Sequence, residues 1–224
     1  MRWNIDLGKD KRTAQRTTQR GVRSCINPTI SWRYPTNDRI IWYKCMPDPV
    51  FSNTLKSGTF SKIGNKYGQA YCTSYGWSIC HPMAKKSEYH DTLSLVFKQD
   101  GVPTKMIVEN SREQSLGEFE RKCKEADCHI VNTGPFPPWS QLAEVCIIEL
   151  NRLSSQQLFK TCSPKRLWDH SIELAALIRF HTAHSNSELE GEVPDTRMTG
   201  QTSNISHICD YEWYKWVMFC DGPT

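Results

Sequence analysis

The sequence lacks any apolar run long enough to cross a bilayer, and its first residues do not resemble a secretory signal. A transmembrane helix needs about 20 apolar residues, whereas apolar runs here, such as Val145–Ile148, are far shorter. The start, MRWNIDLGKDKRT, lacks the apolar stretch of a signal peptide. We therefore expect the ten cysteines to be buried or free thiols in a reducing compartment, the nucleus or the cytoplasm, and not a disulfide framework.

Acidic residues are scarce in the first 44 positions, and the chain has no internal repeat or low-complexity segment. This arm has ten Lys or Arg residues against three Asp residues, a balance of +7, while the rest of the chain carries −3. A basic arm ahead of a nearly neutral body suggests a polyanionic partner, although a solvated arm without a partner has the same pattern. We expect an arm and linker over residues 1–44, a core over 45–184, and a turn-rich, aromatic extension over 185–224.

Hydrophobic patterns in the body predict three strands followed by alternating helices and strands. This order is typical of an α/β fold with a mixed sheet of about five strands and helices on both faces. A surface helix within residues 3–20 is also expected, and Ser115 with Glu118 has the spacing of a capping box. The predicted strands cover residues 50–55, 67–73, 77–81, 105–108 and 128–131, and the predicted helices cover 87–99, 115–126, 141–159 and 164–179.

Two acids occupy positions typical of metal-dependent nucleases. Glu109 ends the apolar run in IVENSREQ, and thirty-five residues later Glu144 opens the helix in SQLAEV. A two-metal phosphoryl-transfer site needs carboxylates from several elements around ions about 3.5–4 Å apart, and Mg²⁺ prefers such hard oxygen ligands. An acid that ends a strand or begins a helix is also commonly solvated, so the pair alone does not establish a site.

Three motifs occur in order along the body. The first, IVENSREQ, is a strand that leads into an acid. The second, GPFPPWSQLAE, is a proline-rich turn followed by a helix. The third is a helix with a Leu-Trp pair, KRLWDHSIELAALI, followed by VPDTRMTGQTSNISHI. Together they make residues 37–219 resemble the integrase core of copia-type long-terminal-repeat retrotransposons, within the ribonuclease H-like superfamily. The resemblance implies a ribonuclease H-like fold, a role in DNA integration and a homo-oligomer.

The resemblance also assigns roles to individual positions. Glu144 matches the third catalytic carboxylate of the family, and Glu109 stands where the second, normally Asp, is found. Asn53, in VFSNTL, stands where the first catalytic Asp is expected, and Ser74 replaces a further acid after the second strand. Such cores use three carboxylates with Mg²⁺ or Mn²⁺ for strand cleavage and transfer, so Glu109 and Glu144 are the implied metal ligands.

These departures predict an inactive protein. Asn53 is neutral, and Glu109 is one methylene longer than Asp, whereas positioning errors of about 1 Å can cost about 10²-fold in rate. Asp48 is an alternative acid, but its odd spacing from Asn53 puts it on the opposite face of a strand, and the flanking prolines disfavour regular pairing. We therefore expect a degenerate integrase-like protein, related to DNA integration, that binds nucleic acid without catalysis.

Basic side chains in the arm and in the later helices are expected to bind nucleic-acid phosphates in a salt-sensitive way. Two other interpretations stay open. One is an active Mg-dependent polynucleotidyl transferase or endonuclease with a substitute acid, and the other is a non-enzymatic relic or interaction protein without a DNA role. The expected phosphate-binding residues are Lys11, Arg12, Arg16, Arg20, Arg23, Arg152, Lys165 and Arg166.

The remaining cysteines, histidines and aromatic residues are expected to be structural. A zinc site would need a spacing such as Cys-x-x-Cys, which this chain does not offer, so core thiols and ordinary histidines are favoured. Trp139 is expected to be a packing anchor, and the aromatic residues of the tail are expected to seal a hydrophobic edge. The residues concerned are Cys123, Cys128, His129, His181 and His184 for zinc, and Trp213, Tyr214, Trp216 and Phe219 in the tail.

Overall fold

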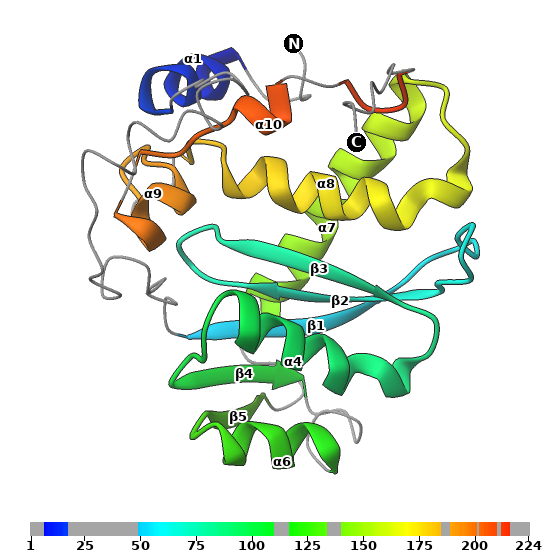
Figure 1. Cartoon of the computed structure of the whole chain (residues 1–224), viewed down its shortest axis with the longest axis vertical. Coiled ribbons are helices and arrows are strands. Elements are labelled where there is room, and N and C mark those ends of the chain that lie inside the picture. The colour runs from blue at the N-terminus through cyan, green and yellow to red at the C-terminus, as the bar shows by residue number, and fades with distance from the viewer. Residues whose placement is uncertain are drawn as a thin grey trace, which may run out of the picture.

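A five-stranded mixed sheet forms the centre of the molecule (Figure 1). The computed structural model describes residues 7–17, 49–109, 117–133, 140–184, 189–200, 202–209 and 212–215. The sheet order is β3-β2-β1-β4-β5; β2 is antiparallel to β1 and β3, while β4 is parallel to β1 and β5. This confirms the predicted α/β architecture. The strands are β1 (Val50–Lys56), β2 (Tyr67–Cys72), β3 (Ser78–Met83), β4 (Lys105–Glu109) and β5 (His129–Thr133).

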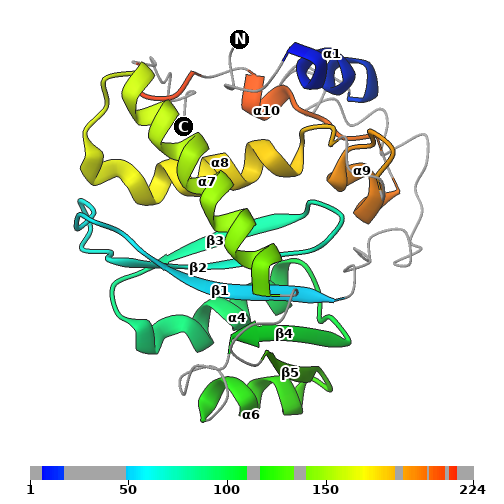
Figure 2. The ribbon, with the colours of Figure 1, turned by 180° about the vertical axis from the view of Figure 1, so that it is seen from behind.

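Helices cover both faces of the sheet. Figures 1 and 2 show α4 and α6 on one face and α7 with α8 on the other. No helix within the described ranges combines the length and apolar character needed to cross a membrane. The helices are α1 (Leu7–Arg16), α4 (Tyr89–Gln99), α6 (Glu118–Glu125), α7 (Ser140–Lys160), α8 (Trp168–Phe180), α9 (Pro194–Thr199) and α10 (Ser206–Cys209), with 3₁₀ helices η2 (Lys86–Glu88) and η3 (Lys165–Leu167).

Alternate side chains of β1 belong to two different hydrophobic cores, one on each face of the sheet. Val50 belongs to the core under α4 and α6, whereas Phe51 and Leu55 belong to the core under α7 and α8. Successive strand side chains point to opposite faces, so Asn53 shares the α7/α8 face with Phe51 and Leu55. The alternation of the sequence thus fixes which face of the sheet Asn53 occupies.

The start of α6 differs from the prediction. The helix begins at Glu118, and its N-cap is Gly117 with a φ of 91° and no side-chain hydrogen bond, so the predicted capping box is wrong. Ser115 itself lies outside the described residues. Gly117 adopts a left-handed conformation that disfavours a side chain. Glu118 instead lies in the first turn, where an acid suits the helix dipole, and accepts a hydrogen bond from Arg121 Nε at 3.0 Å.

The N-terminal helix and the tail both pack on the core. α1 lies within the predicted surface helix, and the buried Thr13 hydroxyl accepts a hydrogen bond from the Ala183 amide at 3.0 Å. In the tail, the turn prediction missed the short helices α9 and α10. Trp213 Nε1 donates to Ser163 Oγ at 3.2 Å, which agrees with a packing role, whereas Tyr214 is 55% exposed and does not seal an edge. Trp139, Trp216 and Phe219 lie outside the described residues.

Candidate functional site

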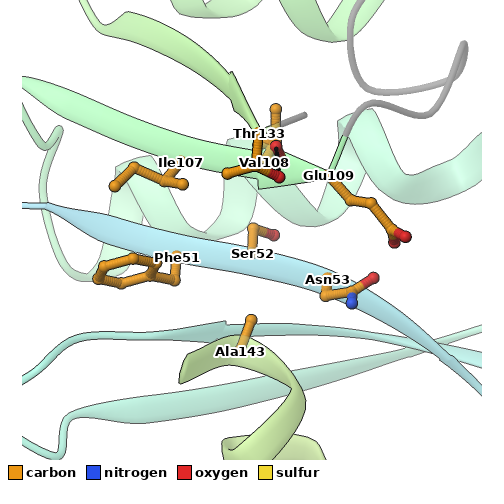
Figure 3. Close-up of a pocket in the computed structure, with 8 residues that line it drawn as sticks. All are labelled: Phe51, Ser52, Asn53, Ile107, Val108, Glu109, Thr133 and Ala143. Carbon is orange, nitrogen blue, oxygen red and sulfur yellow. Dashed lines mark hydrogen bonds between the residues drawn. The ribbon is translucent and has the colours of Figure 1, made fainter. Parts of the chain in front are cut away.

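A small pocket opens where β4 ends, on the α7/α8 face of the sheet (Figure 3). Three parallel strands and the first turn of α7 contribute to it. Its polar side chains come from the ends of β4 and β5 and from the middle of β1. The lining residues are Phe51, Ser52, Asn53, Ile107, Val108, Glu109, Thr133 and Ala143.

The parallel register of β1 and β4 brings Asn53 and Glu109 together. Ser52 is paired with Val108, so the next residue of each strand lies on the opposite face, beside its counterpart. Figure 3 shows the Asn53 and Glu109 side chains next to each other, pointing the same way. Asn53 and Glu109, the two predicted site residues that lie on strands, are therefore neighbours in the fold.

Asn53 has a neutral amide that is already engaged by its own backbone. The side chain is half-buried, and Oδ1 accepts a hydrogen bond from the Thr54 amide at 2.7 Å. The amide oxygen retains a second lone pair, but it has no net charge. Asn53 thus offers one neutral oxygen where a shared metal ion needs a carboxylate.

The opposite face of β1 is fixed by a buried polar network. Gln69 has no exposed surface, and its Nε2 donates to Ser52 Oγ at 2.6 Å. Thr54 Oγ1 in turn donates to Gln69 Oε1 at 2.6 Å. Both ends of the buried amide are satisfied, which stabilises a single register. The strand that carries Asn53 is therefore held firmly in place.

Glu109 is exposed at the end of β4, and Glu144 is exposed on α7. Ala143, the residue before Glu144, faces the pocket and is buried, while Glu144 is not among the lining residues. The structure thus joins Asn53 with Glu109, whereas Glu144 follows the lining residue Ala143 on α7 and does not itself line the pocket. Asp48, the alternative acid, lies outside the described residues.

The donor set of this pocket does not fit a two-metal centre. Such a centre needs several carboxylates that share two ions, but among the described residues that line the pocket Glu109 is the only carboxylate. Across the described part of the chain, no group of three His, Cys, Asp or Glu residues is arranged to hold a metal. A step that runs through two bound ions therefore has no support from the described residues.

Beyond β1 and β4, two residues that the sequence did not predict also line the pocket. Thr133 ends β5, and its Oγ1 donates to the Val108 carbonyl at 3.2 Å. Ala143 closes the pocket from α7. Thr133 could have been found from its place at the end of a parallel strand, whereas a lone alanine in a helix carries no such signal.

Buried thiols lie behind the pocket, one turn further along α7. Arg179 Nη1 contacts Cys146 Sγ at 2.9 Å, and Cys72 Sγ lies 3.9 Å from the Leu142 carbonyl oxygen. A hydrogen bond from Cys72, together with the Arg179 charge, lowers the pKa of Cys146 below that of an ordinary thiol. Every described cysteine is free, and five of them are buried, in line with the thiols expected from the sequence.

The predicted phosphate-binding residues fall into separate regions. Lys11, Arg12 and Arg16 belong to α1, which packs near the end of α8, whereas Lys165 and Arg166 are exposed on η3 at the start of α8. Figures 1 and 2 show these two regions far apart, at opposite ends of α8.

Of the other residues predicted to bind phosphate, only Arg152 lies within the described part of the chain. Arg152 Nη2 pairs with Glu149 Oε1 at 2.7 Å, so its charge is locally balanced. Arg20 and Arg23 lie outside the described residues. Among the described residues predicted to bind phosphate, those other than Arg152 therefore lie on α1 and η3.

The candidate zinc residues lie in different surroundings. Cys123 and Cys128 are buried in the α4/α6 core, while His129 is exposed. His181 Nδ1 is hydrogen-bonded to Ser203 Oγ at 2.7 Å, and His184 Nε2 to the Arg179 carbonyl at 3.0 Å. Burial, with the Arg179 charge, lowers the pKa of His184 to about 4, so it is neutral at pH 7.

Comparisons with known proteins show likeness in fold but not in sequence. No family model and no curated protein matches the chain. A chain of the simian T-cell lymphotropic virus intasome in complex with PP2A regulatory subunit B56 gamma is similar, with a TM-score of 0.57 and 12% identity over 81% of this chain and 63% of that one. The catalytic core domain of BIV integrase is similar, with a TM-score of 0.50 and 12% identity over 73% of this chain and 97% of that one.

These likenesses agree with the strand order and the helices on both faces. The chain spans less than two thirds of the length of the simian virus chain, so that protein's activity and partners do not transfer with the fold. The chain has the ribonuclease H-like fold of integrase cores.

Proposed function

We propose that this chain is a degenerate integrase-like protein of copia type that binds DNA through its phosphates and does not catalyse strand transfer. One observation carries the proposal: the neutral Asn53 side chain lies beside Glu109 in the pocket at the end of β4. The copia assignment rests on the three sequence motifs, and the relation to integration rests on these motifs together with the fold.

The loss of charge at Asn53 supports inactivity. Two divalent cations that share a site repel each other, and bridging carboxylates offset that repulsion. An amide oxygen has no net charge, and that of Asn53 already accepts a hydrogen bond from Thr54. Glu109 and Glu144 alone supply too little negative charge to hold the two metal ions that strand transfer requires.

Basic residues on α1 and η3 support DNA binding. Lys11 and Arg16 on α1, and Lys165 and Arg166 on η3, are exposed. One of the similar structures is an intasome, which agrees with a nucleoprotein role for the fold. Binding through phosphates releases counterions, so affinity is expected to fall steeply between about 50 and 200 mM salt.

A nicking and strand-transfer assay with Mg²⁺ or Mn²⁺ tests the catalytic part. We expect no turnover by the natural chain, and activity only in the double variant Asn53→Asp, Glu109→Asp. Metal-dependent nicking by the natural chain that Glu144→Gln abolishes would show an active enzyme instead.

Filter retention of a DNA duplex at increasing salt tests the binding part. Failure to retain DNA at every salt concentration would favour a relic or interaction protein without a DNA role. Retention that weakens with salt is the expected result.

A further inference from the structure

The tip of the β1–β2 hairpin and the 3₁₀ helix η3 form a basic surface with exposed apolar side chains, which we call the hairpin patch. It lies at the end of the sheet away from α1 (Figures 1 and 2). No role in the pocket requires it, because none of its residues lines the pocket. The hairpin patch consists of Lys56, Phe60, Lys62, Ile63 and Lys66 from the hairpin and Lys165 and Arg166 from η3.

Hydrogen bonds join the two segments, although they are about a hundred residues apart. The Lys62 amide donates to the Arg166 carbonyl at 2.9 Å. Asn65 Nδ2 donates to Asp169 Oδ2 at 3.1 Å, and the other carboxylate oxygen of Asp169 accepts from the His170 amide. The hairpin is thereby fastened to the start of α8, so its cations and those of η3 share one surface.

The charge of the hairpin patch is not balanced locally. Five of its seven residues are Lys or Arg, and residues 49–87 and 150–168 contain no Asp or Glu. Asp169, the next acid, is buried and bonded to Asn65. In the described structure, none of the five cations forms an ion pair with an acid, whereas Arg121, Lys124 and Arg152 elsewhere on the surface do. Such a surface attracts a polyanion.

An aromatic ring stands out from this positive surface. Phe60 is 58% exposed and Ile63 is 67% exposed. Lys66 Nζ lies 4.6 Å from the centroid of the Phe60 ring, a cation–π contact that holds the ring while leaving more than half of the side chain open. Exposed aromatic rings beside cations are typical of surfaces that stack nucleobases.

The hairpin tip is ordered before any ligand arrives. The buried Ser61 hydroxyl accepts hydrogen bonds from the Asn65 amide at 2.9 Å and the Ile63 amide at 3.3 Å. The Ser61 amide also donates to the Asn65 carbonyl at 2.9 Å. A preformed tip loses little conformational entropy on binding, so Phe60 is held in position for an incoming ring.

We infer that the hairpin patch binds single-stranded nucleic acid, with phosphates on Lys62, Lys165 and Arg166 and a base stacked on Phe60. In a duplex the base faces are covered by their neighbours, whereas a single strand presents both phosphates and open base faces. This inference rests on the proposed nucleic-acid binding and adds the class of nucleic acid and its place on the fold. An anionic membrane surface is the competing occupant, and the test includes it.

Fluorescence anisotropy of the full chain with a labelled oligothymidylate and with a blunt duplex tests the inference. We expect Phe60→Ala to weaken single-strand binding by about 10-fold and duplex binding by less than about 2-fold. Phe60→Trp should retain single-strand binding, because tryptophan also stacks. The double variant Lys62→Glu, Arg166→Glu should weaken single-strand binding further and reduce its salt dependence.

Lys98→Glu is the matched control, because Lys98 is exposed on α4, which covers the face of the sheet opposite α8 (Figure 1); it should leave single-strand binding unchanged. Phe60→Ala without effect on the single strand would overturn the inference, and intact duplex binding in the same experiment would leave the proposed function standing. Failure of the natural chain to bind either probe would overturn both. Binding to phosphatidylserine vesicles without binding to the oligonucleotide would also overturn the inference, in favour of a membrane role.

Discussion

The pocket and the hairpin patch are built on the same strand and differ in what each retains. Asn53 lies in the pocket, and three residues later Lys56 begins the hairpin patch. The pocket has a buried, well-packed frame with one carboxylate among its lining residues, whereas the hairpin patch is exposed and has five cations without ion pairs. Packing alone stabilises the frame of the pocket, whatever chemistry the pocket performs. Surface charge gains no such stability, and the proposed ligand of the hairpin patch rests on the cations together with the exposed Phe60 ring.

Replacing one phenylalanine in each region should give the largest difference in the free energy of unfolding. Phe51, which lines the pocket, is 3% exposed, whereas Phe60 in the hairpin patch is 58% exposed. We expect Phe51→Ala to lower the free energy of unfolding by about 3–5 kcal/mol and Phe60→Ala to change it by less than about 0.5 kcal/mol. Urea denaturation followed by circular dichroism measures both. Similar losses in the two variants would contradict the contrast.

The link between Asn65 and Asp169 should give the next largest effect. Asn65→Ala removes one hydrogen bond from the buried Asp169 carboxylate, and bonds to charged groups contribute about 1.5–3 kcal/mol. We expect a loss of that size in the free energy of unfolding, with faster amide exchange in the hairpin. Asn151→Ala, at an exposed position of α7, is the control and should not destabilise the protein. An unchanged exchange rate in the hairpin would show that the link does not hold the patch together.

A histidine beyond the end of α8, half-buried and close to Arg179, is a further test, because the charged hairpin patch has no such group. The pKa of His184 is about 4 in the folded protein against 6.5 ordinarily, because of burial and the Arg179 charge. The unfolded chain therefore binds this proton more tightly, and stability is present above pH 6.5 and lost as the pH falls toward 4. Between pH 7 and pH 5 the loss should reach up to about 2 kcal/mol.

His184→Gln should flatten this pH profile of the unfolding free energy. His170→Gln, which removes an exposed histidine on α8, should leave it unchanged. An equally steep profile in His184→Gln would assign the pH dependence to another group.

Restoring one acid should produce the smallest effect and the most informative one. Asn53→Asp places a second carboxylate beside Glu109, so Mn²⁺ should stabilise the variant by about 1.4 kcal/mol at ten times its Kd. We expect a rise in the melting temperature with Mn²⁺ in this variant and little in the natural chain. Asn151→Asp, away from the pocket, should behave like the natural chain. Equal shifts in all three proteins would show that the pocket is not the ion's site.

Much of the fold could be predicted because the apolar pattern is local. The alternation of VFSNTL gave β1, and the helical stripe from 141 to 159 gave α7 nearly to its ends. The start of α6 was missed because the positive φ of Gly117, and not a capping side chain, sets it. The helices α9 and α10 are too short to show a period and depend on tertiary contacts.

Only the part of the candidate site that depends on strand pairing could be predicted from the sequence. Asn53 and Glu109 meet because two parallel strands carry them, a relation that the order of elements already implies. Whether Ala143 or Glu144 faces the pocket depends on how α7 is rotated against the sheet, and one residue turns a helix by about 100°. The catalytic and metal-binding roles remain predictions. The hairpin patch was beyond prediction, because it joins the β1–β2 hairpin to a distant 3₁₀ helix.

The place of β1 at the centre of the sheet has a consequence for biosynthesis. Among the five strands of the described sheet, β1 leaves the ribosome first, and its antiparallel partner β2 follows directly. Its other edge pairs with β4, in which Met106 lies opposite Val50, so that edge stays open while the intervening segment is translated. An open central edge can recruit a foreign strand. We therefore expect nascent chains that end before β4 to associate with chaperones, and chains that extend through α8 to be released from them.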